Sequence, residues 1–289
     1  MLKIIEKDLT KESTIRTPSY AKYFAVINSS DDFKDAINFK IKNNLFIKII
    51  GNGSNILFSK EYYDKILFLK LGEEFKFLNF NDKNVEIGGS YSLIQAGRNL
   101  VSKGYKDFIF FNLIPATIGG AVRQNAGTGL NEEIKDVCIS CKVFDIKKNN
   151  VVDFSSEQLL FEYRNSIIKK NKDRFVVLSA KFKLENKVDS TEPILSEMKN
   201  RVKEKTNREP KGYCFGSTFM NNKKSAWEYV DSIIDDIEQN NNVYFSKKHK
   251  NWIINNNGTG NDVKNLITLA QKLIKEKLNI DLKEEVDII

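Results

Sequence analysis

The N-terminal part of the chain alternates helical and strand patterns of apolar positions. Residues 31–43 have the spacing of an amphipathic helix, and an apolar strand is predicted at 45–50. Another short apolar run begins at Ile56, so the stretch "GNGSN" at 51–55 joins two strands. Such a turn is neither a P-loop nor a Rossmann turn, because both of those glycine loops open a helix.

The middle of the chain has the pattern of short strands and helices separated by glycines. Strands are predicted at 65–71 and 85–87, and Ser90 or Ser92 is expected to cap a helix that ends at Gly104. A dense group of glycines follows at positions 119, 120, 127 and 129. This density indicates backbone that closely approaches another group or adopts positive φ.

Strand patterns dominate from residue 137 to 184 before helical periods return. The apolar residues of the last strand alternate with period two, which predicts one buried face formed by Val176, Leu178, Ala180, Phe182 and Leu184. A helical stripe over about 262–278 and a short closing strand in "EEVDII" complete the pattern. The mixture predicts an α+β protein with two mixed lobes and a smaller third domain, rather than a doubly wound parallel sheet.

Composition narrows the class of protein. The chain has 289 residues, 41% of them hydrophobic, and a formal net charge of +8. The charge suits an anionic partner, but the basic residues are spread along the chain, which favours ordinary solubility. The N-terminus has no apolar signal-peptide core, and no run of about 18 apolar residues occurs. We therefore expect a cytoplasmic protein that has no membrane segment.

The cysteines include the spacing C-x-x-C at Cys138 and Cys141. That spacing is typical of a redox pair or half of a zinc site, yet no second pair exists and His249 is the only histidine. On a strand, positions three apart point to opposite faces. We expect two buried or half-buried thiols and no metal site.

Two glycine turns could offer backbone N–H groups to an anion. They are residues 51–55 and the segment "ATIGG" at 116–120. Turns poor in side chains bind phosphate oxygens through their amides, whereas a single such turn is more often a plain connection. The presence of both turns, together with "QNAG" at 124–127, leaves a phosphate-binding role and a structural role open.

Six motifs in a fixed order extend this interpretation. They are "GNGSN", "IPATIGGAVRQNAG", "FEYRNSI", "FGSTFMN", "KHKNWIINN" and the closing "EEVDII". With these motifs the chain resembles the UDP-N-acetylenolpyruvoylglucosamine reductase family, also called UDP-N-acetylmuramate dehydrogenase, in its shorter form. The resemblance runs from about residue 14 to the C-terminus. Members of that family are flavoenzymes of peptidoglycan precursor synthesis.

The resemblance implies an FAD-binding fold of the vanillyl-alcohol-oxidase (PCMH) type. Residues 1–70 and 71–188 would form two FAD-binding lobes, and residues 189–289 a substrate-binding domain whose last residues, about 282–289, return to the flavin site. FAD would be bound non-covalently, with NADPH as co-substrate. The implied FAD-binding positions are Gly51, Gly53, Ser54, Asn55, Pro115, Thr117, Gly119, Gly120 and Asn125.

The family reaction implies three catalytic positions. Hydride passes from NADPH to the flavin and then to the enolpyruvyl ether, which develops enolate charge and takes up a proton. Arg164 would hold the substrate carboxylate, Ser217 would donate the proton, and Glu285 would support the enolate or relay the proton. Glu284 is the alternative if the register shifts by one. A salt bridge, a turn and a solvated strand edge are the respective structural alternatives.

Contacts with the substrate, UDP-N-acetylenolpyruvoylglucosamine, are implied for Lys205 and Asn221. His249 lies in a similar family motif, but its lysine neighbours favour an exposed side chain without acid–base function. Three positions depart from the glycine, proline and arginine that the family usually has, namely Ala116, Asn222 and Asp287. Nothing in the sequence fixes the oligomeric state, and a monomer is expected.

Two other functions are weighed against this one. An FAD-dependent oxidase of a sugar or alcohol on the same fold would release hydrogen peroxide, but such oxidases often tether flavin to a histidine or cysteine, and no histidine lies in the two lobes. A basic nucleic-acid-binding protein would be colourless and bind in a salt-dependent way. No basic stripe interleaved with aromatic residues supports that alternative.

Overall fold

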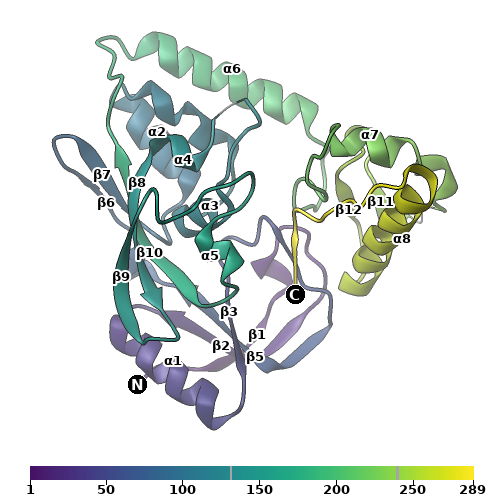
Figure 1. The fold of residues 1–289 in the computed structure, drawn as a ribbon, viewed down its shortest axis with the longest axis horizontal. Coiled ribbons are helices and arrows are strands. Elements are labelled where there is room, and N and C mark those ends of the chain that lie inside the picture. Colours follow the sequence, from purple (N-terminus) through teal and green to yellow (C-terminus); the bar gives the residue numbers. More distant parts are fainter. Residues whose placement is uncertain (131, 239–240) are drawn as a thin grey trace. The chain divides into compact units, whose positions relative to one another are not determined.

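The computed structural model describes residues 1–130, 132–238 and 241–289 (Figure 1). Helices and strands are mixed along the chain, as the α+β prediction requires. The chain forms two compact units: residues 1–5, 23–52 and 65–204 make up the first, and residues 6–22, 53–64 and 205–289 the second. The three-domain division drawn from the sequence, with boundaries after residues 70 and 188, stays a prediction.

A five-stranded antiparallel sheet forms the centre of the first unit (Figure 1). In the order in which they pair, its strands are β6 (Leu78–Phe80), β7 (Asn84–Gly88), β10 (Phe175–Lys183), β8 (Cys138–Asp145) and β9 (Asn150–Ser155). β10 is the central strand and is buried over most of its length. It therefore contributes to the apolar cores on both faces of the sheet.

β10 differs from the single buried face predicted for it. The register of β10 against β8 shifts between Val177 and Ser179, which is a β-bulge. As a result Val176 packs into one core, whereas Ala180 and Phe182 pack into the other. The prediction of one buried face was wrong because the extra residue sends the later side chains to the opposite side of the sheet.

A second register shift lies at the start of β8. Lys181 pairs with Ser140, but Phe182 pairs with Cys138, so one residue of β8 is left without a partner in this register. Both Cys138 and Cys141 consequently face the same core. The predicted burial of these free thiols is confirmed, and their placement on opposite faces was wrong. Burial raises the pKa of the Cys138 thiol to about 12, so it stays protonated at neutral pH.

Helices cover both faces of the first unit's sheet. Apolar residues of α2, α3 and α4 share one core with strands β7, β8 and β10, while α1 packs into the other core. Ser92, one of two predicted caps, accepts a hydrogen bond from the Gln95 N–H at 3.4 Å and begins α2. The helices are α1 (Ser30–Lys42), η2 (Glu73–Phe75), α2 (Leu93–Ser102), η3 (Lys106–Leu113), α3 (Ile118–Gln124), α4 (Ile134–Val137), α5 (Ile167–Lys170) and α6 (Glu192–Arg208), whose last residues belong to the second unit.

A second sheet has the strand order β1-β2-β5-β3. Its strands are β1 (Ile5–Asp8), β2 (Tyr20–Ile27), β5 (Tyr62–Leu71) and β3 (Phe46–Ile49), and β3 runs parallel to β5. α1 buries Phe33 and Ala36 in the core that this sheet lines. The ring of Phe33 stacks on that of Phe144, with centroids 4.2 Å apart. The apolar stripe predicted over residues 31–43 therefore forms part of this core.

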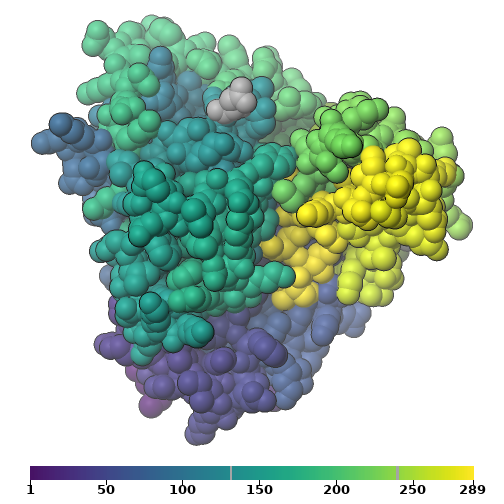
Figure 2. Space-filling view, viewed as in Figure 1, coloured from purple at the N-terminus to yellow at the C-terminus, as the bar shows by residue number. Residues whose placement is uncertain are grey.

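The second unit is built on short strands and one long helix. α8 (Gly260–Leu278) packs the predicted stripe against an apolar core that also contains Phe215, Phe219 and Val286. Much of residues 205–289, coloured green to yellow, is exposed on the face drawn in Figure 2. Its elements are η1 (Thr10–Glu12), β4 (Ile56–Leu57), α7 (Ala226–Asp231), η4 (Ile234–Asp236), β11 (Val243–Phe245), β12 (Ile253–Asn255), α8 and β13 (Asp287–Ile288). None of the helices in the described parts of the chain is long and apolar enough to span a membrane.

Candidate functional site

The two predicted glycine turns approach each other at Gly51 and Thr117, which both belong to the first unit, whereas residues 53–55 belong to the second. A Cβ added at Gly51 would lie 2.8 Å from Thr117 Oγ1. This hydroxyl is already used, because it accepts a hydrogen bond from the Gly120 N–H at 3.2 Å and caps the N-terminus of α3. A side chain at Gly51 would therefore displace the cap of a helix that begins in the other motif.

The first turn keeps its backbone donors available. Among the described residues, the N–H groups of residues 51–55 donate to no protein acceptor. Gly53 has φ +66°, and a Cβ there would lie 1.9 Å from the Glu12 carbonyl oxygen, so only glycine fits. Consecutive free amides are the donor set that binds the oxygens of a diphosphate. The predicted residues therefore fit FAD at this turn.

The second turn contributes in a different way. The Gly119 N–H donates to the Gly89 carbonyl at 2.9 Å, and the Gly120 N–H is taken by Thr117. A Cβ at Gly119 would lie 3.1 Å from that Gly89 oxygen, whereas a Cβ at Gly120 would meet only Thr117 Oγ1, at 3.4 Å. Gly119 thus permits α3 to pack closely against the Gly89 carbonyl, whereas the surface of α3 at Gly120 is uncrowded. Any contact of FAD with these glycines would use close approach rather than N–H donation.

Asn125 ends α3 in the left-handed conformation, with φ +45°, and is fully buried. Its Nδ2 donates to Glu133 Oε2 and to the Glu162 carbonyl, both at 3.0 Å, while its Oδ1 accepts from the Lys135 N–H at 3.0 Å. The side-chain amide is therefore bound within the protein. Of the other predicted FAD positions, Ser54 and Asn55 are half-buried and Pro115 is exposed.

Arg164 is buried, and its side chain contacts the carboxylate of Glu133, which also accepts from Asn125. Its Nη2 donates to the Gly127 carbonyl at 2.9 Å, and its Nη1 pairs with Glu133 Oε1 at 3.4 Å. The guanidinium carbon lies 5.0 Å from the centroid of the Tyr163 ring. Arg164 has φ +55°, a conformation that is uncommon for a residue with a side chain. These contacts fix the guanidinium as part of a buried network, and Glu133, which the sequence did not single out, links it to Asn125.

Ser217 lies in a segment that Asn251 holds from both sides. The Asn251 side chain accepts from the Phe219 N–H and donates to the Phe219 carbonyl, both at 2.9 Å, and its own carbonyl accepts from the Thr218 N–H. Ser217 itself forms a bridge with Trp252. Its hydroxyl makes no hydrogen bond within the described parts of the chain. The serine is thus half-buried, positioned by its backbone and free at its oxygen.

The segment that carries Glu285 runs beside the Ser217 segment. The Glu285 N–H donates to the Thr218 carbonyl at 2.8 Å, and Phe219 forms a bridge with Glu284. In this register Glu285 lies opposite Thr218, the residue that follows Ser217. Glu285 is half-buried rather than a fully solvated edge residue.

The end of the chain also returns to the first glycine turn. β13 pairs in parallel with β4, and the Asp287 N–H donates to the Asn55 carbonyl at 3.0 Å. Asn55 Nδ2 donates to the Glu285 carbonyl at 3.0 Å. The return of residues 282–289 therefore reaches one of the residues predicted to bind FAD, within the second unit.

The predicted substrate residues have protein partners. Lys205 Nζ pairs with Glu209, and Asn221 Oδ1 accepts from the Ala226 N–H at 2.9 Å at the start of α7. His249 is half-buried rather than exposed, and desolvation lowers the pKa of its imidazole, which favours the neutral form. Among the described residues, no three His, Cys, Asp or Glu side chains gather as a metal site.

Two residues next to predicted site residues have buried polar atoms that are unpaired among the described residues. Both amide atoms of Gln124 and the Thr218 hydroxyl are buried without a hydrogen-bond partner in the described parts of the chain. Gln124 lies in the "QNAG" stretch and Thr218 follows Ser217, so each is a neighbour of a predicted site residue. An unpaired buried polar group costs about 1–3 kcal/mol, and such cost is often found at functional sites.

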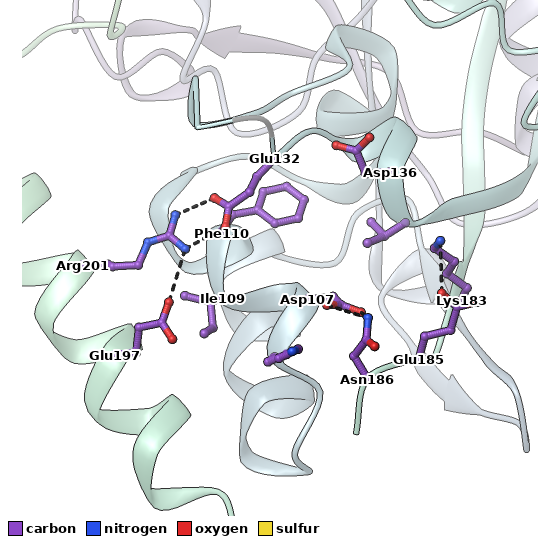
Figure 3. Close-up of a pocket in the computed structure, with 12 residues that line it drawn as sticks. Asp107, Ile109, Phe110, Glu132, Asp136, Lys183, Glu185, Asn186, Glu197 and Arg201 are labelled. Carbon is purple, nitrogen blue, oxygen red and sulfur yellow. Dashed lines mark hydrogen bonds and ion pairs between the residues drawn. The ribbon is translucent and has the colours of Figure 1, made fainter. Parts of the chain in front are cut away.

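A cleft of about 370 Å³ lies elsewhere in the first unit (Figure 3). Its charged side chains are largely paired with one another. Arg201 donates to both oxygens of Glu132, at 2.8 and 2.5 Å, and Lys183 lies 3.2 Å from Glu185. None of the residues predicted to bind cofactor or substrate lines this cleft. It is therefore not the candidate site.

Comparison with known proteins shows to which family this chain belongs. Residues 21–155 match the family model of an FAD binding domain, and residues 207–289 match that of the UDP-N-acetylenolpyruvoylglucosamine reductase C-terminal domain. The UDP-N-acetylenolpyruvoylglucosamine reductase of Chlamydia felis is 30% identical over 97% of this chain and 92% of its own. That of Pelagibacter ubique is 33% identical over 84% and 80%. The chain belongs to the UDP-N-acetylenolpyruvoylglucosamine reductase family.

A solved structure shows the same fold. The crystal structure of UDP-N-acetylenolpyruvylglucosamine reductase from Thermus caldophilus matches with a TM-score of 0.81 at 23% identity, over 100% of this chain and 99% of that one. The predicted family, the α+β FAD-binding fold, the FAD cofactor and the class of FAD-dependent oxidoreductase are confirmed. These matches favour the reductase over the oxidase and the nucleic-acid-binding protein. The roles of individual residues stay predictions.

Proposed function

We propose that this protein is an NADPH-dependent flavoenzyme that reduces UDP-N-acetylenolpyruvoylglucosamine to UDP-N-acetylmuramate. The free amides of residues 51–55 would hold the diphosphate of FAD, and Gly51 adds no side chain to the turn. When bound, FAD supplies hydride transfer from NADPH to the enolpyruvyl group. The remaining chemistry, which is charge stabilisation and proton transfer, belongs to the protein's own side chains.

Arg164 would bind the substrate carboxylate. Its guanidinium is always charged and can form two parallel hydrogen bonds with a carboxylate. Glu133 and the Gly127 carbonyl fix its orientation before substrate arrives. A charge held in place beforehand stabilises the negative charge that develops in the enolate without reorganising during the reaction.

Ser217 would donate the proton, with Glu285 supporting the enolate or relaying the proton. A serine hydroxyl is a weak acid, so it can serve only a strongly basic acceptor such as a carbanionic carbon. The Ser217 oxygen has no protein partner in the described residues, and Gly216, with φ +83°, precedes it with open space on its Cβ side. These features leave the hydroxyl accessible to a ligand.

One observation carries this proposal more than any other. The motif that contains Ser217 and the closing motif that contains Glu285 are hydrogen-bonded neighbours, through the Thr218 carbonyl and the Glu285 N–H. Both lie within the matched reductase C-terminal domain. Two separate motifs that fold into adjacent segments, each with a half-buried polar side chain, support a common site for Ser217 and Glu285.

Lys205 and Asn221 would contact the sugar nucleotide. Lys205 is half-buried beside Glu209, so binding a phosphate would replace one anionic partner by another. Asn221 uses its Oδ1 at the start of α7, and its Nδ2 is the group that could donate to the ligand. Location in the cytoplasm and a monomeric state stay predictions.

An anaerobic spectroscopic experiment tests the function. The purified protein should be yellow, NADPH should bleach the visible flavin absorbance, and the enolpyruvyl sugar nucleotide should restore it. A colourless protein with salt-dependent binding to nucleic acid would contradict the proposal. So would bleaching by a sugar or alcohol, with hydrogen peroxide formed on readmission of air and no reduction by NADPH.

A further inference from the structure

Both backbone polar groups of Glu285 are held by named partners. Its N–H donates to the Thr218 carbonyl at 2.8 Å, and its carbonyl accepts from Asn55 Nδ2 at 3.0 Å. Asn55 also accepts, through its own carbonyl, the N–H of Asp287 at 3.0 Å. Asn55 therefore binds the chain on both sides of Val286, which is buried in the core of the second unit. The backbone of Glu285 is therefore held at both its N–H and its carbonyl.

We propose that the Asn55 side chain is a positioning residue for Glu285, so that the turn that binds the cofactor and the segment of the acidic residue form one hydrogen-bonded unit. The two roles of Asn55 use different atoms. Its backbone N–H belongs to the free amides of residues 51–55, whereas its side-chain amide is committed to the Glu285 carbonyl. This inference rests on the proposed function, because that function gives Glu285 its part in the reaction.

The geometry demands a donor at this position. A carbonyl oxygen accepts hydrogen bonds only, so Asn55 must present its NH₂ group to Glu285. Aspartate has the same shape but, when ionised, no donor. Alanine removes the group altogether. Asn55→Ala keeps the backbone N–H and adds no charge to the turn, and so it separates cofactor binding from positioning.

Other bonds keep the end of the chain in place when this one is lost. The Ile289 carbonyl accepts from the Ser59 N–H at 3.0 Å and from Ser59 Oγ at 2.6 Å, and the Ile289 N–H donates to the Leu57 carbonyl at 2.9 Å. Loss of the Asn55 bond should therefore loosen Glu285 locally without detaching β13. Ser59→Ala removes a hydrogen bond from the same terminal segment without touching Glu285, which makes it a matched control.

The experiment compares Asn55→Ala, Asn55→Asp and Ser59→Ala with the wild type. For Asn55→Ala we expect faster hydrogen exchange at the Glu285 amide and an FAD dissociation constant, titrated on the apoprotein, within about threefold of wild type. With FAD saturating, flavin reduction by NADPH should be near normal, and reoxidation by the enolpyruvyl sugar nucleotide should fall roughly tenfold or more. Asn55→Asp should show the same loss of reoxidation. Ser59→Ala should change exchange only around Ile289.

A double-mutant cycle with Glu285→Gln decides whether Asn55 acts through that carboxylate. Once Glu285→Gln has lost its acidic function, adding Asn55→Ala should slow reoxidation little further. Additive effects, equal loss of both half-reactions, or unchanged exchange at Glu285 would each overturn the inference while leaving the proposed function standing. If wild-type flavin is reduced by NADPH but not reoxidised by the sugar nucleotide, the proposed function fails, and this inference fails with it.

Discussion

A methyl group on Gly51 would stand 2.8 Å from the hydroxyl oxygen of Thr117. Two turns from separate motifs thus share one close contact within the first unit, and the hydroxyl at that contact caps α3 through the Gly120 N–H. The two turns differ in whether their backbone N–H groups are hydrogen-bonded within the protein. Among the described residues, the N–H groups of residues 51–55 have no protein acceptor, whereas those of Gly119 and Gly120 are already hydrogen-bonded.

Replacing Gly120 with alanine should separate stability from cofactor binding. Gly120 is exposed on α3, where a Cβ would meet only Thr117 Oγ1 at 3.4 Å. Alanine should raise the free energy of unfolding of the apoprotein by about 0.5–1 kcal/mol, because glycine is the poorer helix former. If FAD lies against this glycine, its affinity should fall by roughly tenfold, which is about 1.4 kcal/mol. Chemical unfolding and FAD titration measure the two effects, and an unchanged affinity would count against contact at Gly120.

Ser217 and Thr218 form a natural pair of test and control. Ser217→Ala should leave flavin reduction by NADPH near normal and stop turnover of the sugar substrate, because only the second step needs the proton. Thr218→Val removes a buried hydroxyl that has no hydrogen-bond partner among the described residues, so it should raise the free energy of unfolding by about 1 kcal/mol and retain turnover. Stopped-flow measurement of both half-reactions distinguishes the variants. Equal loss of both steps in Ser217→Ala would show that the serine is not the proton donor.

Arg164→Lys should lower turnover by about 100-fold, since an ammonium group cannot form the forked contact with a carboxylate. Backbone strain does not confound this test, because arginine and lysine meet the same cost at φ +55°. Glu133→Gln keeps the shape of the residue that orients Arg164 but removes its charge, and it should cause a smaller loss. Steady-state kinetics with the enolpyruvyl substrate give the comparison. Turnover of Arg164→Lys within twofold of wild type would remove Arg164 from the site.

The ion pair of Asp145 and Arg174 should make stability depend on pH. Asp145 is buried and accepts from Arg174 Nη2 at 2.7 Å, and this hydrogen bond lowers the pKa of the carboxyl group. A lowered folded-state pKa means that the contribution is complete above the ordinary value of 3.8 and is lost as the pH falls through the folded-state value. Asp145→Asn should therefore lower the free energy of unfolding by about 1–3 kcal/mol at neutral pH, and less in acid. Urea unfolding at several pH values tests this, and a pH-independent difference would contradict it.

Local patterns predicted most elements of the fold. The apolar stripe of α8, the cap at Ser92 and the strand that became β10 depend on residues within a few positions of one another. The β-bulges of β8 and β10 were not predictable in this way. The register between two strands depends on the partner strand, and period-two alternation assumes that no residue is inserted. This is why the faces of Cys138 and Val176 were misjudged.

The motifs of the sequence predicted the candidate site residues, but they did not predict the residues that hold those side chains in place. The sequence indicated Arg164 and Ser217. It did not indicate that Glu133 orients Arg164, or that Asn251 binds the backbone of the segment that contains Ser217. Each of these partners comes from a distant part of the chain, so only the fold reveals it. Gln124 shows the same limit, because an unpaired amide can be recognised only once its surroundings are known.

The central claim is that the backbone amides of residues 51–55 bind the diphosphate of FAD. Titration of the apoprotein with FAD and with riboflavin, which lacks phosphate, tests it most directly. The account predicts that FAD binds at least about 100-fold more tightly, a difference of roughly 2.7 kcal/mol. Equal affinity for the two flavins would contradict it.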